Sequence, residues 1–235
     1  DYIVLSPGIS LIEKKKLIKF KNKIITDIDF LFLTSKNFKS IVVTGTNGKS
    51  TTCKIISHLI KKNKFKVLLG GNIGTPILNL KIQKNSYVVI EASSFQLSHS
   101  KFIRPDYAFL LNITNDHLNW HGNMLNYINS KTKIFKLQEN NQFALVNKKL
   151  KQIFRKRKFK SKLIIPDEKK YKKIKSKIKN DYLKLSINDE NMSFLYTFSK
   201  LLKISETRFI TAINSFIGLS HRYEIFLKKK NIVFI

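Results

Sequence analysis

The chain has 235 residues, 43% of them apolar, so it can bury a sizeable core, and its longest apolar runs, such as residues 107–111, are far too short to span a membrane. Its 45 Lys and Arg residues against 15 Asp and Glu give a formal charge of +30, a balance that also occurs in nucleic-acid binders. Because the lysines are spread along the chain without interleaved aromatic clusters, we interpret them as solvated surface and expect no nucleic-acid partner.

Segments of strand length alternate with helical patterns along the chain. The predicted strands lie in "DYIVL" at the start, at residues 41–44, 67–69, 87–90, 107–111 and 143–146, and in "NIVFI" at the end. The predicted helices lie at residues 51–62, 94–101, 124–137, 191–203 and 205–216. This alternation predicts an α/β fold with a mostly parallel sheet flanked by helices, in which ligands gather beyond the carboxyl ends of the strands. We interpret the lysine-rich residues 148–179 as an irregular or peripheral part.

The stretch "IVVTGTNGKSTT" joins the second predicted strand to the first predicted helix. Gly45 and Gly48 allow a tight turn in which backbone N–H groups and the positive end of the helix surround an anion. Lys49 supplies a mobile charge for terminal phosphates, and the hydroxyl of Ser50 can face a magnesium ion. We predict a phosphate-binding loop, although Val43 replaces a glycine of the general pattern. The alternative is an ordinary glycine-rich turn with an incidental lysine.

The helix after this loop has an inward apolar stripe formed by Cys53, Ile56, Leu59 and Ile60. Cys53 is therefore predicted to be a core residue. As the single cysteine it excludes an internal disulfide, which fits a reducing compartment. We expect a cytoplasmic, monomeric protein without membrane insertion.

Two polar residues follow predicted strands at the ligand edge of the sheet. Glu91 comes directly after residues 87–90, where its carboxylate could hold a magnesium ion opposite Ser50. The alternative for Glu91 is a strand-end carboxylate in water. His117 lies in a polar loop with Asp116 after the next strand, and this place favours a role in the site over simple surface exposure.

Lys131 interrupts the apolar face of the predicted helix at residues 124–137. The apolar residues of that face are Met124, Tyr127, Ile128, Ile134 and Phe135. A lysine in this position is costly unless its side chain snorkels to the surface or is chemically altered. Both alternatives stay open on the residues alone.

Several motifs occur in an order that resembles the Mur ligases, the ATP-dependent amino-acid ligases of cell-wall precursor synthesis. Besides "TGTNGKS" they are "LSPGI", "GGNIGTP", "EASSFQL", "LNITNDHLNWHG" and "GLSHRYE". "GGNIG" and "SSFQL" favour the D-glutamate-adding member over other Mur-type ligases and over folate-polyglutamylating ligases, which share a similar loop. The resemblance covers nearly the whole chain, although residues 148–188 contribute little.

The resemblance implies a role for individual residues. ATP would be held by Gly45, Thr46, Asn47, Gly48, Lys49, Ser50, Thr51, Asn191 and Arg222. The UDP-linked substrate would be contacted by Ser6, Pro7, Gly8, Asn72, Gln96 and His117. Mg²⁺ would be bound by Ser50, Glu91, His117 and a carbamylated Lys131. The catalytic residues would be Lys49, His117 and Lys131. From the residues alone, Asn72 and Gln96 are loop amides suited to a polar ligand, and Asn191 is more simply a helix N-cap.

The resemblance also implies a reaction and a domain organisation. ATP would phosphorylate the carboxylate of UDP-N-acetylmuramoyl-L-alanine, and D-glutamate would attack the acyl phosphate. Residues 1–39 would end an N-terminal substrate-binding domain, residues 40–219 would form the central ATP-binding domain, and residues 220–235 would begin a truncated C-terminal domain. We therefore expect a fragment that binds nucleotide weakly and does not turn over. A binding module for ATP or other polyanions, without catalysis, is the alternative from another class.

Overall fold

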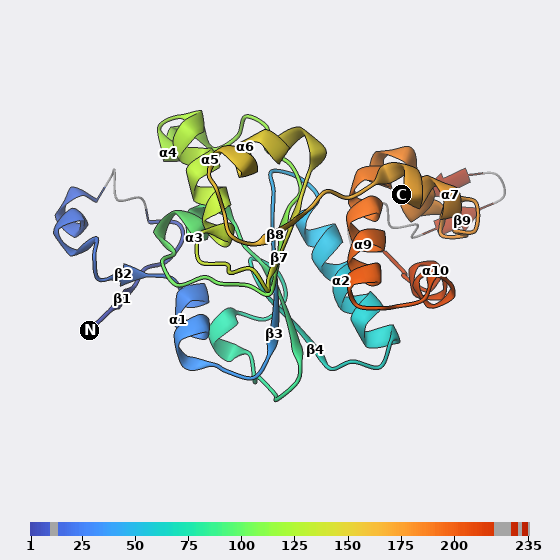
Figure 1. Cartoon of the computed structure of the whole chain (residues 1–235), viewed down its shortest axis with the longest axis horizontal. Coiled ribbons are helices and arrows are strands. Elements are labelled where there is room, and N and C mark those ends of the chain that lie inside the picture. The colour runs from blue at the N-terminus through green and yellow to red at the C-terminus, as the bar shows by residue number, and fades with distance from the viewer. Residues whose placement is uncertain (10–13, 219–226, 230–231, 235) are drawn as a thin grey trace.

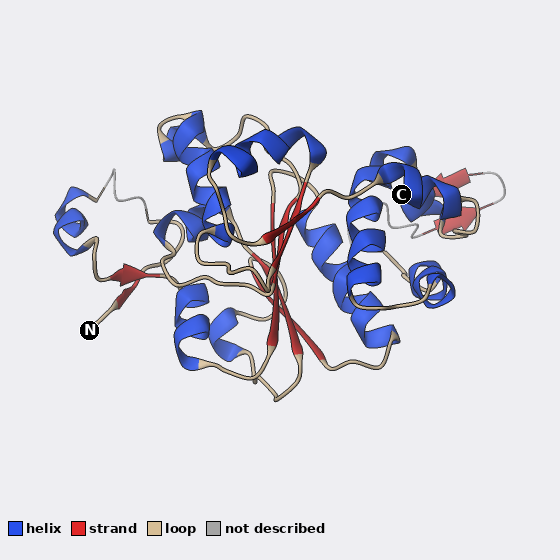
Figure 2. Cartoon of the chain, viewed as in Figure 1, coloured by secondary structure: helices blue, strands red, loops and turns tan. Residues whose placement is uncertain are grey.

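A six-stranded parallel sheet forms the centre of the molecule, and helices cover both of its faces (Figures 1 and 2). This computed structural model describes residues 1–9, 14–218, 227–229 and 232–234. The strands lie side by side in the order β4 (Val67–Gly71), β5 (Tyr87–Glu91), β3 (Lys39–Thr44), β6 (Tyr107–Leu110), β7 (Phe143–Val146) and β8 (Lys162–Ile164). All neighbouring pairs in this sheet are parallel, so the predicted α/β fold is confirmed.

The strands are nearly continuous apolar runs because both faces of the sheet are covered. In β3, Ile41 and Val43 pack on one face and Val42 packs on the other, and all three are fully buried. The five central strands predicted from the sequence are all present, with bounds that differ from the predicted ones by at most two residues.

One face of the sheet is covered by helices from the phosphate loop and from the second half of the chain. They are α2 (Lys49–Lys62), α7 (Glu168–Lys175), α8 (Asp181–Lys184), α9 (Asp189–Leu201) and α10 (Glu206–Asn214), with the 3-10 helix η5 (Ser186–Asn188) before α9. Figure 1 shows α2, α9 and α10 on the same side of the sheet. The predicted stripe of α2, including Cys53, has no exposed surface and is confirmed.

The opposite face is covered by shorter helices. They are α1 (Asp27–Thr34), α3 (Ser94–His99) and α6 (Lys151–Lys156), with the 3-10 helices η2 (Ile77–Asn79), η3 (Lys133–Phe135) and η4 (Lys148–Leu150). Helix α5 (Met124–Thr132) packs against α3, and α4 (Leu118–His121) packs against α5. The helix predicted at residues 124–137 is therefore an α-helix that continues as a 3-10 turn.

A small N-terminal unit is attached to the end of α3. Strand β1 (Ile3–Val4) pairs in parallel with β2 (Ile24–Ile25), and the 3-10 helix η1 (Lys15–Phe20) lies between them. Lys101, which follows α3, donates a hydrogen bond through Nζ to the backbone carbonyl of Lys21 in this unit at 2.6 Å. The chain closes with β9 (Leu227–Lys229) and β10 (Ile232–Phe234), an antiparallel pair. Strands are thus present in both "DYIVL" and "NIVFI", as predicted.

The interpretation of residues 148–179 as irregular or peripheral is wrong. This stretch contains η4, α6, β8 and α7, and β8 is the edge strand of the central sheet. Tyr171 and Ile174, three positions apart, bury one face of α7 in the core while its lysines cover the other faces. Because lysine is so abundant in this segment, its composition alone does not reveal this narrow apolar stripe. Among the described residues, no helix combines the length and apolar character that crossing a membrane requires.

Candidate functional site

The predicted phosphate loop connects the carboxyl end of β3 to the N-terminus of α2. Gly48 precedes α2 with a φ of 81°, in the left-handed region that favours glycine. A Cβ atom on Gly48 would lie 2.7 Å from Nδ2 of Asn191, so any side chain here would also have to displace the Asn191 amide. The N–H groups of the first turn of α2 have no partner within the helix, and together with the helix dipole they form an anion-binding position.

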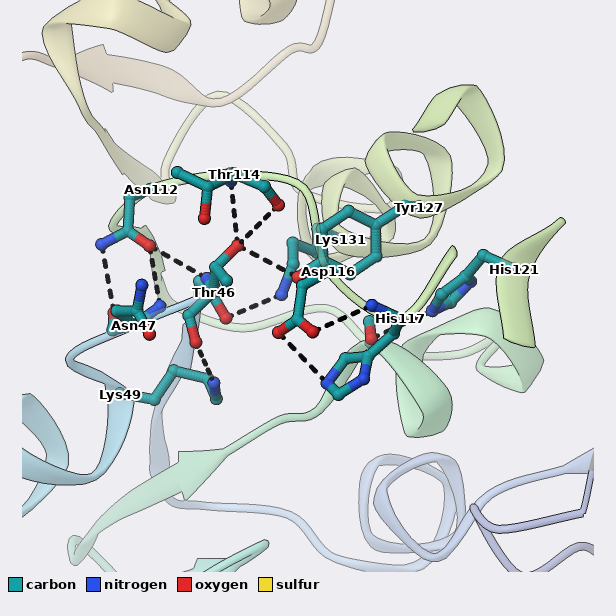
Figure 3. A network of polar contacts seen from close by, with 12 residues as sticks. Thr46, Asn47, Lys49, Asn112, Thr114, Asp116, His117, His121, Tyr127 and Lys131 are labelled. Carbon is teal, nitrogen blue, oxygen red and sulfur yellow. Dashed lines mark hydrogen bonds and ion pairs between the residues drawn. The ribbon is translucent and has the colours of Figure 1, made fainter. Parts of the chain in front are cut away.

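Asn112, which follows β6, holds this loop in shape (Figure 3). Its Oδ1 accepts hydrogen bonds from the backbone N–H groups of Thr46 and Asn47, at 3.0 and 2.8 Å, and its Nδ2 donates to the carbonyl of Asn47 at 3.1 Å. These two amides are therefore used inside the protein, and the binding capacity of the loop lies at the start of α2. The sequence analysis missed Asn112, because a polar residue directly after a buried strand is an ordinary feature.

Two lysines point their ammonium groups at carbonyls of the same loop (Figure 3). Lys49 Nζ donates to the carbonyl of Thr46 at 2.8 Å, and Lys131 Nζ donates to the carbonyl of Gly45 at 2.7 Å. Lys131 is only 1% exposed, so the snorkelling alternative is wrong and the predicted inward placement is confirmed. Burial first, and then the charge of Lys49, lowers the pKa of Lys131 from 10.5 to about 7, although Asp116 acts in the opposite direction.

Tyr127 connects the loop to Lys131. Its hydroxyl lies 3.0 Å from Oγ1 of Thr46, and the Lys131 Nζ lies 4.6 Å from the centre of its ring. Thr46 Oγ1 also accepts a hydrogen bond from the backbone N–H of Thr114 at 3.0 Å. Tyr127 is fully enclosed, at 1% exposure, so this connection between α5 and the loop is a fixed part of the site.

Glu91 ends β5 and is 1% exposed, so the alternative of a carboxylate in water is wrong. Its Oε1 accepts a hydrogen bond from Nδ2 of Asn72 at 3.0 Å, whereas its Oε2 is buried with no hydrogen-bond partner among the described residues. A buried carboxylate oxygen without a donor is suited to binding a cation. The described residues contain no group of three or more His, Cys, Asp or Glu side chains that could hold a metal ion, so part of the coordination would have to come from other donors, such as hydroxyl groups, phosphate oxygens or water.

His117 lies at the start of α4 with a φ of 52° and a half-exposed side chain. Its Nε2 is 3.4 Å from a carboxylate oxygen of Asp116, and its ring packs against Phe95 at 4.7 Å between centroids. The neighbouring His121 lies 3.0 Å from the Ser94 hydroxyl and is mostly enclosed. Burial, followed by the charge of Lys131, lowers the pKa of His121 to about 4, so His121 is neutral at pH 7.

Of three other predicted site residues, one lies beside Glu91 and two have a local position different from the predicted one. Asn72 lies beside Glu91, as described above. Gln96 is not a loop amide as predicted: it belongs to α3, where its Oε1 closes a capping box with Ser93 and its Nε2 lies 3.3 Å from Asp27. Asn191 is not an N-cap either, because Asn188 precedes α9, but it touches Gly48 of the loop.

Residues 6–8, which are predicted to contact the UDP-linked substrate, follow strand β1. They form a turn in which the Ile9 N–H donates to the Ser6 carbonyl at 3.1 Å. The Ile9 carbonyl in turn lies 3.2 Å from Nε2 of His99, at the end of α3. The N-terminal turn is thereby held close to α3. Arg222 lies outside the described residues.

A comparison with protein families identifies the family to which this chain belongs. The description "Mur ligase middle domain" matches residues 43–218, which include the loop, Glu91, His117 and Lys131. The chain belongs to the Mur ligase family. The chain is 38% identical over its whole length to the "UDP-N-acetylmuramoylalanine--D-glutamate ligase" of Rickettsia felis and 30% identical to that of Pseudothermotoga lettingae. It spans 57% and 56% of these two relatives, so it covers little more than half of their length.

Solved structures of Mur ligases and of FolC share the fold of this chain. MurF of Thermotoga maritima in complex with ADP aligns over 90% of this chain and 58% of its own, with a TM-score of 0.61 and 18% identity. FolC of E. coli in complex with ADP aligns over 97% of this chain and 71% of its own, with a TM-score of 0.56 and 12% identity. At these identities the likeness supports the fold of the central domain and says nothing of the substrate.

Proposed function

We propose that this Mur ligase joins D-glutamate to UDP-N-acetylmuramoyl-L-alanine at the expense of ATP, through an acyl phosphate. The observation that carries the proposal is the meeting of a phosphate loop, the unpartnered oxygen of Glu91 and the buried Lys131 at one edge of the sheet. The substrates are proposed from the names of the relatives and from the "GGNIG" and "SSFQL" motifs. The activity is proposed for the protein to which this chain belongs.

In this proposal the chain contributes position and positive charge. The first N–H groups of α2 bind phosphate oxygens, and Lys49 turns from the Thr46 carbonyl to the terminal phosphates. Asn191 approaches the loop at Gly48, and in this proposal it contacts the adenine of the nucleotide. Both reactants are anions, so the approach of the substrate carboxylate to the γ-phosphoryl group depends on these cations.

The oxygen donors at this edge of the sheet are suited to magnesium. Ser50 at the start of α2 and Glu91 at the end of β5 supply the oxygen ligands that Mg²⁺ prefers, and His117 is placed on the neighbouring loop. When bound, the ion would neutralise phosphate charge during transfer. The buried Oε2 of Glu91 would thereby gain the partner that it lacks.

Lys131 is proposed to carry a carbamate. A lysine with a pKa of about 7 is substantially neutral at physiological pH, and only the neutral amine can attack carbon dioxide. The attack forms one N–C bond, opens one C=O π bond of carbon dioxide onto its oxygen and releases one amine proton, so the neutral amine becomes a carbamate anion. Tyr127, whose ring lies beside Nζ and whose hydroxyl is fixed on Thr46, would hold that anion in place. With ¹³C-labelled bicarbonate, wild-type protein should show a carbamate resonance that Lys131→Ala lacks. A spectrum without that resonance would overturn the modification.

Other functions stay as alternatives. A different Mur-type ligase, a folate-polyglutamylating ligase or a non-catalytic ATP or polyanion module could share the loop. The ligase assay should use the longest chain that the gene encodes, with ATP, Mg²⁺ and UDP-N-acetylmuramoyl-L-alanine, and D-glutamate, meso-diaminopimelate or L-lysine as acceptor. D-glutamate should give an amide product detected by mass, whereas a product with another acceptor alone would refute the assignment. For the 235-residue chain itself, we expect weak, salt-resistant, magnesium-dependent ADP binding without turnover.

A further inference from the structure

Two residues at the start of α9 tie this helix to its neighbours on the same face of the sheet. Asn188, which precedes α9, donates through Nδ2 to the carbonyl of Tyr182 in α8 at 2.6 Å. Asp189, the first residue of α9, pairs with Lys175 at the end of α7, with 2.6 Å between Oδ1 and Nζ. These two side chains are only 10% and 22% exposed, so salt screens their pair weakly. Figure 1 shows α7 beside α9, and the start of α9 is fixed against both α7 and α8.

The next residue, Glu190, ties α9 to the carboxyl edge of the sheet. Its Oε1 accepts a hydrogen bond from Nδ2 of Asn147, which follows β7. Asn147 is buried and is itself fixed, because Nδ2 also donates to the Leu111 carbonyl at 2.7 Å and Oδ1 accepts from the backbone N–H of Lys149 at 2.9 Å. The helix dipole favours acidic residues in a first turn, but it does not require a partner on the sheet. Glu190 is therefore a third anchor of this turn.

Asn191 is the fourth residue in this series and has no such anchor. Successive residues of a helix point about 100° apart around its axis, so the three anchored side chains and Asn191 face in four different directions. The direction of Asn191 is towards the phosphate loop, where its Nδ2 and Oδ1 lie 2.7 and 3.0 Å from the place that a Cβ atom on Gly48 would take. Its side-chain amide makes no hydrogen bond within the described part of the chain, and the residue is partly exposed. One donor group and one acceptor therefore remain available beside the loop.

We propose that Lys175 and Asn147 are positioning residues, which fix the Asn191 amide for the base of the nucleotide. They act through the two acidic residues of the first turn of α9, to which they are bonded. An amide in a fixed orientation donates to one atom of a base and accepts from the next, and adenine offers an acceptor ring nitrogen beside its amino group. Guanine offers two neighbouring acceptors at the same edge, so one of the two bonds is lost. The anchors thereby set a preference for adenine over guanine. This inference rests on the nucleotide site of the proposed function.

The ion pair of Lys175 is tested by nucleotide binding, measured by calorimetry with Mg²⁺ on the longest chain that the gene encodes. Wild-type protein should bind ADP more tightly than GDP. Lys175→Met should weaken ADP binding by about fivefold, because the hydrogen bonds to the base lose their alignment, and should leave GDP binding within about twofold. Lys175→Arg keeps a cation for Asp189 and should keep the preference for ADP within about twofold of wild type. Inorganic tripolyphosphate, which has phosphates but no base, should bind all three proteins equally.

Substitutions of Glu190 test the second anchor while the ion pair of Lys175 stays intact. Glu190→Ala removes the acceptor of the Asn147 amide and should reduce the preference for ADP over GDP by about threefold or more. Glu190→Gln removes the same charge but keeps an acceptor oxygen, so its preference should stay within about twofold of wild type. The comparison of these two variants separates the hydrogen bond to Asn147 from the effect of a negative charge near the phosphates.

The matched control is Lys177→Met, which breaks an exposed ion pair with Glu206, 2.8 Å long, two residues beyond Lys175. It should leave the affinity for both nucleotides within about twofold. Equal losses of ADP, GDP and tripolyphosphate binding in Lys175→Met, an equal effect of Lys177→Met, or wild-type binding without a preference would each overturn the inference. If wild-type protein binds no nucleotide, the proposed function fails with it. If the expected preference is found but no amide forms, the ligase assignment alone fails and the positioning role stands.

Discussion

Replacing Lys131 by methionine should change how the stability of the protein depends on pH. In the folded chain the pKa of Lys131 is about 7, against an ordinary value of 10.5, because the amine is buried beside Lys49. Between these two values the unfolded chain binds a proton at this residue that the folded chain does not. Wild-type stability therefore gains a contribution that rises with pH from about 7 to about 10.5.

The magnitude of this contribution follows from the fall of the Lys131 pKa from 10.5 to about 7. Each unit corresponds to about 1.4 kcal/mol, so burying the amine costs about 5 kcal/mol below pH 7 and nothing above 10.5. Lys131→Met removes this titration and keeps an apolar chain of similar length in the stripe. It also removes the hydrogen bond to the Gly45 carbonyl, which changes the free energy of unfolding by an amount that does not depend on pH.

The assay is urea unfolding of both proteins between pH 6 and 10, in buffers freed of carbon dioxide so that the amine stays unmodified. The free energy of unfolding of the variant minus that of the wild type should fall by about 1.4 kcal/mol per pH unit above pH 7. Lys136→Met, at an exposed position solvated in both states, should give a curve parallel to wild type. Parallel curves for Lys131→Met as well would refute the claim that the amine is buried and neutral.

Three further substitutions test the site and the core. Gly48→Ala should cost about 1–2 kcal/mol of unfolding free energy, because alanine is strained at this φ and meets Asn191, and calorimetry should show weaker ADP binding; unchanged binding would contradict the loop geometry. Tyr127→Phe should cost about 1 kcal/mol in urea unfolding through loss of its contact with Thr46, and an unchanged midpoint would contradict that contact. Phe109→Ala should cost about 3–5 kcal/mol in the same assay, because the ring is fully buried, and a cost below about 1 kcal/mol would contradict that burial.

The fold was predictable where the sequence pattern and the tertiary environment agree. Strands such as β3 are buried on both faces, so their central residues, here Ile41 to Val43, are apolar and the run is visible in the sequence. β8 is an edge strand of three residues, and only part of its surface is covered. It has too few apolar residues to be distinguished from the lysine-rich sequence on either side. A prediction that depends on long apolar runs therefore misses short edge strands.

The candidate site was predictable where a residue breaks a pattern. Lys131 stands out because a lysine occupies an apolar face, and the structure confirms that it is buried. Asn112 breaks no pattern, since a polar residue after a strand is ordinary, and its role exists only through two distant backbone amides. Gln96 was misplaced although "SSFQ" contains the spacing of a capping box, which the structure shows between Ser93 and Gln96.

The arrangement of the loop explains how one edge of the sheet can hold two lysine side chains before any ligand arrives. Lys49 and Lys131 each rest on a carbonyl of the loop itself, that of Thr46 and that of Gly45. A carbonyl is a weaker partner for an ammonium group than a phosphate oxygen, so Lys49 gains energy when it turns to the nucleotide. The loop does not lose its shape in that exchange, because Asn112 holds two of its amides independently of either lysine. In the proposed function the recognition of phosphate would thereby be separated from the folding of the loop, because the Lys49 side chain can turn while Asn112 keeps its contacts.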